Sequence, residues 1–269
     1  MRTALISDIH SNLSAFETVL ADIDARKVDR IVSLGDIIGY GPDPKECVDL
    51  VAKRCEWSLM GNHDFGVLYE PTNFNAAAES AAYWTRRQLE PPANGTAEAA
   101  GYDREEAVRR WNFLGSLRVR VTWGPFLSVH GSPRRPINEY IFPEDPLNSA
   151  KKLKDIFARI KPSRVCLVGH THVPGVFTDD PDFLPAAEMA DGLYTFSGKE
   201  MVIVNPGSVG QPRDLDPRAS YAILETGDAD EPVSVTFIRL DYDIERTVAK
   251  IRATEELNDW LGERLLQGR

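Results

Sequence analysis

Residues 3–36, TALISDIHSNLSAFETVLADIDARKVDRIVSLGD, contain the pattern that decides the fold. A short β-rich run, TALIS, precedes an amphipathic stretch at 15–25, and a second apolar run, RIVSLG, follows it. Ser14-x-x-Glu17 is typical of a capping box at the start of a helix. The stretch therefore predicts a strand, a helix and a second strand.

The same order continues in the next residues. Asp43, Pro44 and Glu46 predict the start of a helix that ends near Arg54, and EWSLMG (56–61) predicts a third strand. This alternation of strands and helices predicts an α/β fold built on a parallel sheet whose two faces are covered.

The segment at about 66–117 differs in character from its surroundings. An alanine-rich stretch, NAAAESAAYWTRRQL, is followed by the polar break PPANGTAEAAG and by a helix that Asp103-x-x-Glu106 would open. We interpret this segment as a small helical cap inserted into a single domain that spans residues 1–269.

The second half predicts further strands and two helices. RVRVTW and PFLSVHG form a predicted hairpin across Gly124-Pro125, followed by a helix at 147–160 and the buried strand RVCLVG. Four short strands, GVFT, MVIVNPG, SYAILE and VSVTFIRL, precede a final helix from about Ile244 to Leu266.

The composition limits the classes of partner. The net charge of -10 argues against a general nucleic-acid-binding surface. No apolar run of about 18 residues could span a membrane, and no signal-peptide core precedes Asp8, so we expect a cytoplasmic protein. Cys47, Cys55 and Cys166 have no CxxC spacing and are interpreted as free structural thiols.

Polar side chains gather where the predicted strands end, which is where open α/β sheets bind their ligands. All five histidines of the chain lie in these strand-end motifs, whereas structural histidines would be scattered. The residues are Asp8, His10, Asp36, Asn62, His63, Asp64, His130, His170 and His172.

This mixture of carboxylate, amide and imidazole groups without thiolate favours borderline divalent ions, namely Mn, Fe, Zn, Co or Ni, with Mn or Fe preferred. Seven candidate ligands exceed what one tetrahedral ion needs, so a shared carboxylate would let them hold two ions. Two such ions would attract an anionic phosphate, and would lower the pKa of bound water toward about 7.

At this point the sequence resembles the calcineurin-like metallophosphoesterase superfamily, in its bacterial phosphodiesterase or diadenosine-tetraphosphatase-like branch. The resemblance rests on five ordered motifs over about residues 1–175: Asp8-x-His10, Gly35-Asp36, Gly61-Asn62-His63-Asp64, His130-Gly131 and Gly169-His170-x-His172. It implies a four-layer α/β/β/α sandwich of two mixed sheets. It also implies a binuclear centre, in which hydroxide that bridges the metals attacks phosphorus.

The resemblance also implies a division of roles. One ion would be held by Asp8, His10, Asp36 and His172, and the other by Asp36, Asn62, His130 and His170, with Asp36 bridging. His63 would face the substrate and stabilise or protonate the leaving oxygen without binding metal. Asp64 is better interpreted as a cap or local hydrogen-bonding group.

One motif departs from the protein phosphatases of this superfamily. They carry GDxxDRG, where this chain has GDIIGYG, so that Gly39 and Tyr40 replace the Asp that supports the catalytic histidine and the Arg that binds phosphate. Tyr40 could stack on a leaving group or simply pack a turn. Arg134, Arg135 and Arg213 are candidate phosphate-binding groups, and Arg213, after NPGSVGQP, is the best of the three.

The pattern as a whole predicts a metal-dependent phosphoesterase that acts on a small phosphorylated substrate such as a nucleotide. We favour phosphodiester or dinucleoside polyphosphate bonds. The alternatives are a phosphomonoesterase or protein phosphatase of the same superfamily, and a non-catalytic metal-binding scaffold. Aromatic residues of the insertion, Tyr69, Tyr83, Trp84 and Trp111, could line a substrate pocket or form the core of the cap.

Overall fold

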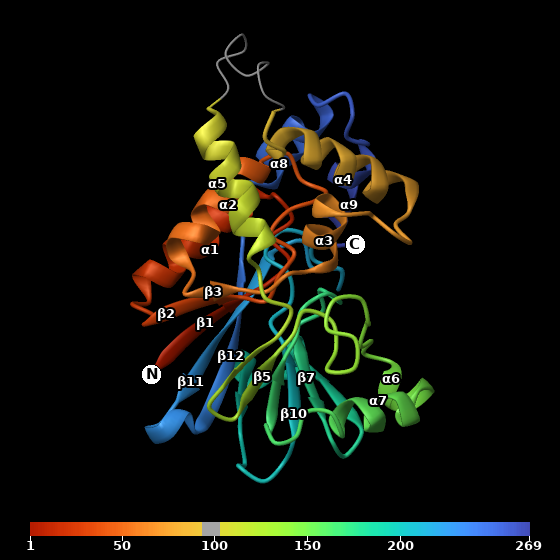
Figure 1. Ribbon diagram of the computed structural model, residues 1–269. Coiled ribbons are helices and arrows are strands. Elements are labelled where there is room, and N and C mark those ends of the chain that lie inside the picture. Colours follow the sequence, from red (N-terminus) through yellow and green to blue (C-terminus); the bar gives the residue numbers. More distant parts are fainter. Residues whose placement is uncertain (93–102) are drawn as a thin grey trace.

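A computed structural model describes residues 1–92 and 103–269, and their strands form two six-stranded sheets (Figure 1). The first sheet begins with three parallel strands, β1, β2 and β3, as the sequence predicts. Helices α1 and α2 form the two connections. The bounds are β1 (Arg2–Ile6), α1 (Leu13–Ala25), β2 (Arg30–Ser33), α2 (Pro44–Arg54) and β3 (Trp57–Ser58).

The other half of this sheet is antiparallel and comes from the second half of the chain. Strand β11 (Ala219–Thr226) pairs with β1, β12 (Pro232–Leu240) pairs with β11, and β9 (Leu193–Thr195) pairs with β12. The full order is β3-β2-β1-β11-β12-β9. The first sheet is therefore mixed, and β1 lies inside it.

The second sheet has the order β4-β5-β6-β10-β7-β8. Strands β5, β6 and β10 are parallel, and the predicted hairpin between β4 and β5 is confirmed. The bounds are β4 (Val121–Trp123), β5 (Phe126–Ser128), β6 (Val165–Leu167), β7 (Gly175–Thr178), β8 (Asp182–Pro185) and β10 (Val202–Asn205).

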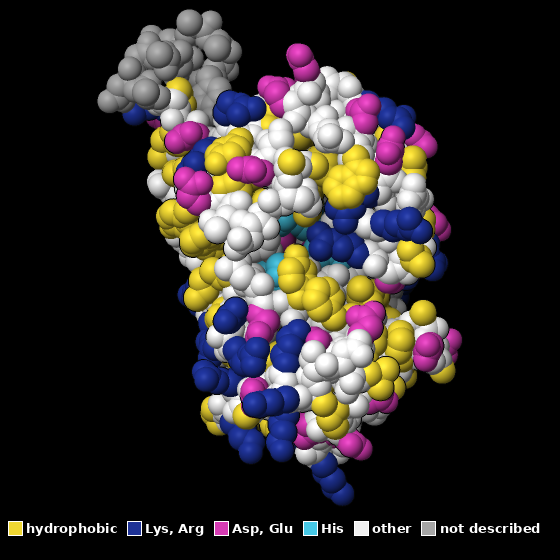
Figure 2. Space-filling model, turned by 90° about the vertical axis from the view of Figure 1, so that its right-hand side faces the viewer, with side chains coloured by type: hydrophobic (Ala, Val, Ile, Leu, Met, Phe, Trp, Pro, Cys, Tyr) yellow, Lys and Arg dark blue, Asp and Glu magenta, His cyan; other side chains and the backbone are white. Residues whose placement is uncertain are grey.

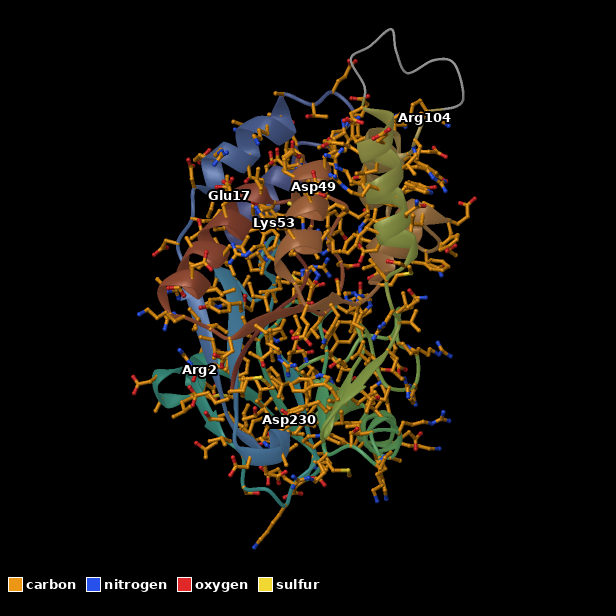
Figure 3. The ribbon with its side chains drawn as sticks, turned by 60° about the vertical axis from the view of Figure 1, so that its left-hand side comes forward. Arg2, Glu17, Asp49, Lys53, Arg104 and Asp230 are labelled. Carbon is orange, nitrogen blue, oxygen red and sulfur yellow. The ribbon has the colours of Figure 1, made fainter. Side chains whose placement is uncertain are left out.

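The two sheets pack face to face, because side chains of both, such as Leu5 and Leu167, share one apolar cluster. A second cluster joins the first sheet to α1 and α2, and a third joins the second sheet to α7 (Ala150–Phe157). Glu17 and Lys53 lie on the exposed faces of α1 and α2 (Figure 3). The predicted four-layer α/β/β/α sandwich is confirmed.

Three helices, α3 (Asn62–Leu68), α4 (Ala76–Leu89) and α5 (Arg104–Gly115), occupy the segment interpreted as the cap. Most of its polar break, residues 93–102, lies outside the described residues. Arg110 on α5 forms an ion pair with Asp49 on α2, with 2.6 Å between Nη2 and Oδ2. Trp84 is buried where α4 meets the C-terminal helices, so it belongs to an apolar core.

Several local predictions were wrong. Asn12, rather than Ser14, caps α1, because its side chain accepts a hydrogen bond from the Ala15 amide. The helix expected at 147–160 is broken at Ser149 into α6 (Asp145–Asn148) and α7. The C-terminal helix is also two, α8 (Ile244–Arg252) and α9 (Trp260–Gln267).

Short elements complete the described part of the chain. Strands β8 and β9 have no counterpart among the sequence predictions, and each has only three or four residues. The 3-10 helices are η2 (Ala186–Glu188), η3 (Ala190–Gly192) and η4 (Asp228–Asp230). Within the described residues, no helix has both the length and the apolar character that a membrane crossing requires.

Candidate metal centre

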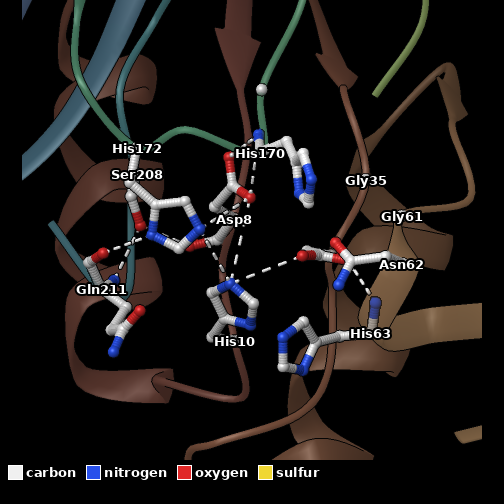
Figure 4. Close-up of polar contacts among 12 residues, drawn as sticks. Asp8, His10, Gly35, Gly61, Asn62, His63, His170, His172, Ser208 and Gln211 are labelled. Carbon is white, nitrogen blue, oxygen red and sulfur yellow. Dashed lines mark hydrogen bonds and ion pairs between the residues drawn. The ribbon is translucent and has the colours of Figure 1, made fainter. Parts of the chain in front are cut away.

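The strand-end residues of both sheets meet at one place. Strands β1, β2 and β3 of the first sheet precede Asp8 and His10, Asp36, and Asn62, respectively, while β5 and β6 of the second sheet precede His130 and the pair His170 and His172. Figure 4 shows Asp8, His10, His170 and His172 around one centre. The site is thus built only when the two sheets are packed together.

The loops that carry these side chains have an unusual backbone. Five of the residues have a left-handed φ between 49° and 66°, a region that L-residues rarely adopt outside turns and functional sites. Hydrogen bonds between the loops hold this conformation: the amide of Asp8 donates to Gly35 (2.9 Å), and that of His10 donates to Asp36 (3.0 Å). The five are Asp8, His10, Asp36, His170 and His172.

One group of donors has its candidate ligand atoms within 4.8 Å of one another: Asp8, His10, Asp36 and His172. The Nε2 atoms of His10 and His172 are 3.3 Å apart, and Nε2 of His172 lies 3.2 Å from Oδ1 of Asp8. All four residues are buried. This group matches the first ligand set that the sequence resemblance implies.

A second group shares Asp36 with the first. It contains Asp36, His130 and His170, and Nε2 of His130 lies 3.3 Å from Oδ2 of Asp36. The side-chain oxygen of Asn62 is also 3.3 Å from Nε2 of His130. The structure therefore brings all seven predicted ligands together, with one carboxylate common to both groups.

The histidine rings are oriented as metal ligands are. Nδ1–H of His10 donates to the carbonyl of Ile38 (3.2 Å), that of His172 to Gln211 (2.5 Å) and that of His130 to Leu34 (2.8 Å). Such a bond fixes the tautomer and leaves the Nε2 lone pair facing the cluster. Burial also holds the pKa of His10 and of His170 well below the usual value, which favours neutral imidazole.

Two buried atoms of the centre lack a hydrogen-bond partner within the described residues: Oδ2 of Asp36 and Nε2 of His170. Buried polar atoms are normally satisfied, and these two point into the donor groups. The negative charge of the centre also affects His130. Burial alone would lower its pKa, but the Asp36 and Asp8 carboxylates and the hydrogen bond to Leu34 together raise the pKa to about 9. The residues present therefore fit divalent ions.

His63 lies beside the donor groups and in neither of them. Its amide donates to Oδ1 of Asp36 (2.8 Å), and its ring is held between Tyr40 and Phe74, with centroid distances of 4.3 and 4.4 Å. The side chain is 4 % exposed, and its buried Nδ1 has no hydrogen-bond partner within the described residues. Burial lowers the pKa of His63 to about 4.

The backbone at Gly39 explains why the GDIIGYG motif lacks the Asp that the GDxxDRG motif has at this position. Its φ is +89°, and a Cβ atom at this position would lie 2.5 Å from Nδ1 of His63. The backbone itself packs against the imidazole, so the Asp of the GDxxDRG motif has no room here. Aromatic rings, rather than a carboxylate, position His63 in this chain.

Asp64 holds the loop after β2, which carries Asp36, through hydrogen bonds, in agreement with its interpretation as a local hydrogen-bonding group. Its Oδ2 accepts the amides of Asp36 and Gly61, both at 2.9 Å, and its Oδ1 accepts those of Ile37 (3.0 Å) and Ile38 (3.3 Å). The side chain is fully buried. It fixes the strand-end loop that carries Asp36, the carboxylate common to both donor groups.

The candidate substrate residues have different surroundings. Arg213 lies at the site, since its Nη2 is 3.4 Å from the Tyr40 hydroxyl and 2.9 Å from Oε1 of Gln211. Arg134 forms ion pairs with Glu139 and Asp155, so its charge is already compensated within the chain.

Two aromatic residues near the donors gave no usable signal in the sequence. Tyr140 stacks on the His170 ring at 3.7 Å, and Phe74 contacts His63. Neither belongs to a motif, and only the fold brings them to the centre. Tyr69, one of the proposed pocket residues, is 52 % exposed. Figure 2 shows histidine side chains at the bottom of a hollow, with Lys or Arg side chains directly beside them.

A sandwich of two mixed sheets with such a donor cluster at its strand ends defines a metal-dependent phosphoester hydrolase. Comparison with known proteins agrees, since residues 1–229 match the calcineurin-like phosphoesterase superfamily domain. The chain belongs to the calcineurin-like phosphoesterase superfamily.

Similar proteins cover the whole chain. The crystal structure of a metallophosphoesterase from Sphaerobacter thermophilus is 39 % identical, with a TM-score of 0.80 over 100 % of this chain and 99 % of the other. An uncharacterized protein from Methanocaldococcus jannaschii is 34 % identical over 99 % of this chain and 98 % of its own length. A hypothetical protein from Pyrococcus horikoshii shares the fold at 19 % identity, with a TM-score of 0.72 and coverage of 100 % and 98 %.

Proposed function

We propose that the protein hydrolyses phosphodiester or dinucleoside polyphosphate bonds with the help of two divalent ions, Mn or Fe being favoured. The observation that carries the proposal is the pair of buried donor groups that share Asp36, with imidazole Nε2 atoms facing inward. Asp8, His10, Asp36 and His172 would hold one ion. Asp36, Asn62, His130 and His170 would hold the other.

Bound ions of this kind lower the pKa of water and neutralise phosphate oxygens. The chain contributes the rest. His63 approaches the reacting phosphate from beside the donors and stabilises or protonates the leaving oxygen, which accounts for its buried and unpaired Nδ1. Tyr40 and Phe74 exclude water from its ring.

The choice of a diester over a phosphoprotein rests on the surroundings of His63. The Arg of the protein phosphatases is replaced by Tyr40, whose ring is 8 % exposed and packs against His10 and His63. Arg213 then supplies positive charge from a different loop. An enclosed, aromatic and basic site suits a small organic phosphate better than a peptide.

The test combines metal analysis with turnover of three substrates, bis(p-nitrophenyl) phosphate, p-nitrophenyl phosphate and diadenosine tetraphosphate, in added Mn²⁺. We expect His63→Ala to keep the wild-type metal content and to lose turnover by about 10²–10⁴-fold. Asp36→Ala should lose both metal and turnover. Asp241→Ala removes an exposed carboxylate and is the matched control.

Wild-type protein that holds no metal and turns over none of the substrates would refute the proposal. Turnover confined to p-nitrophenyl phosphate would instead identify a phosphomonoesterase. If His63→Ala retained the wild-type rate, the role given to His63 would be wrong.

A further inference from the structure

Two arginines from distant parts of the chain meet at Tyr40. The guanidinium of Arg213 lies 6.0 Å from the centroid of the Tyr40 ring, and that of Arg264, on α9, lies 5.9 Å from it. Arg264 also stacks over Trp260 at 4.5 Å. Both arginines are half-buried, so neither extends freely into solvent.

Neither guanidinium forms an ion pair with a carboxylate in residues 1–92 and 103–269. The acidic residues that follow Arg213 already form ion pairs with other arginines: Asp214 pairs with Arg239, and Asp216 pairs with Arg218. Burial, and then the neighbouring Arg213, lower the pKa of Arg264, as expected for two like charges near one another. An anion between them would remove this cost.

The arginine pair lies next to the metal ligands but does not overlap them. The Tyr40 ring contacts His10 and His63, with centroid distances of 4.7 and 4.3 Å, and the Arg264 guanidinium lies 5.9 Å from the centroid of the same ring. An anionic group held by Arg264 would consequently be a second group of the substrate, distinct from the phosphoryl group at the metals.

The position of Arg264 is fixed by the C-terminal packing. Leu261 and Leu265, on either side of it in α9, are buried in the same apolar cluster as Tyr40. The carbonyl of Gly268 accepts a hydrogen bond from the Leu215 amide at 2.9 Å, which ties the end of α9 to the loop that carries Arg213. A charge held in place in this way loses little entropy when it binds a ligand.

We propose that Arg264, next to Arg213, binds a second phosphate group of the substrate, so that the enzyme selects esters of diphosphate or longer chains over simple diesters. This inference rests on the proposed function. It assigns a specificity role to the segment after residue 229, which lies beyond the stretch that matches the superfamily domain.

The experiment compares Arg264→Gln, Arg264→Lys and the wild type, with Arg252→Gln on exposed α8 surface as the matched control. AMP and ADP are used as probes at constant free Mn²⁺, first in calorimetric titrations and then as inhibitors of bis(p-nitrophenyl) phosphate hydrolysis. We expect the wild type to bind ADP at least tenfold more tightly than AMP. Arg264→Gln should abolish most of that difference, Arg264→Lys should retain part of it, and Arg252→Gln should behave as wild type.

Hydrolysis of bis(p-nitrophenyl) phosphate by Arg264→Gln should stay within about twofold of wild type, because this substrate has a single phosphate. Equal affinities of the wild type for AMP and ADP would overturn the inference, as would ADP inhibition that is not competitive with the diester. A wild type without any diesterase activity would contradict the proposed function instead, and the calorimetric comparison would still test the arginine pair.

Discussion

Replacement of Asp64 by Asn tests whether a single carboxylate holds the loop after β2, which carries Asp36, in place. The two side chains have nearly the same shape, but Asp64 accepts four backbone amides, two on each oxygen. In Asn one oxygen becomes an NH₂ group, which would face two N–H donors. The substitution therefore changes the hydrogen bonding of the loop without changing its packing volume.

The magnitude follows from the number of bonds lost. Burial, and then the neighbouring Asp36 carboxylate, raise the pKa of Asp64 to about 7, so the comparison is made above about pH 8, where Asp64 is charged. Two hydrogen bonds to this charged acceptor disappear, each worth about 1.5–3 kcal/mol, so we expect a loss of about 3–6 kcal/mol in the free energy of unfolding. The buried amides left without acceptors have no access to water, since Asp36, Ile37, Ile38 and Gly61 are all buried. A loss of this size is a large part of the stability of a typical domain.

Urea denaturation followed by tryptophan fluorescence measures this loss. Both proteins are treated with EDTA, so that the difference reports the loop alone, and Asp241→Asn serves as the exposed control. In separate samples, metal analysis should show reduced occupancy in Asp64→Asn, because either the amides of Asp36 and Gly61 or those of Ile37 and Ile38 lose their acceptor in the loop that carries Asp36. A difference in unfolding free energy below about 1 kcal/mol would refute the reasoning, and would mean that Asp64 is protonated in the native loop.

Other predictions follow from particular contacts. Gly39→Ala should reduce turnover at least tenfold while metal content is unchanged, because its Cβ would displace His63; Gly198→Ala, also at positive φ but in open space, should be nearly silent in the same assays. Removal of metal with EDTA should lower the melting temperature by about 5–10 °C in a thermal scan, if each ion is present at about a hundred times its Kd; an unchanged melting temperature would contradict a metal centre. Cys47 and Cys166 are buried, and burial raises the pKa of both thiols, so they should react with a thiol reagent at pH 8 only after unfolding.

Much of the fold could be predicted because its elements are local and periodic. The strand-helix alternation over residues 3–61 gave the parallel half of the first sheet, and the Asp43-Pro44 helix start was confirmed. The errors arose where a tertiary contact determines at which residue a helix begins or ends. Asn12 caps α1 while its Nδ2 donates to the Gly210 carbonyl, a contact between residues 198 positions apart.

The break between α8 and α9 has a similar cause. No Gly or Pro lies between Arg252 and Trp260, so the segment was predicted as continuous helix. In the structure Leu257 is buried in the cluster below α4, and the Asn258 side chain accepts the Trp260 amide. The role of Asn258 could have been predicted from the sequence, because Asn commonly starts a helix. The burial of Leu257 could not.

The seven candidate metal ligands could be predicted to lie together because each follows a strand in a short motif, and the fold brings all seven to one place. The residues that would surround the substrate could not be predicted. Phe74, Tyr140 and Arg264 belong to the cap, a long loop and the last helix, and nothing in their local sequence separates them from ordinary core or surface residues. Their convergence depends on packing between separate elements, and in the case of Arg264 and Tyr40 the two residues are 224 positions apart.

The placement of β1 inside its sheet has a consequence for synthesis on the ribosome. One edge of β1 pairs with β2, which follows within about thirty residues, but the other edge pairs with β11, which ends at Thr226. Until that strand has emerged, the nascent chain presents an unpaired apolar edge next to Asp8 and His10. Closing the sheet around β1 is thus a late step, and a chain arrested before residue 219 would carry every proposed metal ligand without the strand that completes their support.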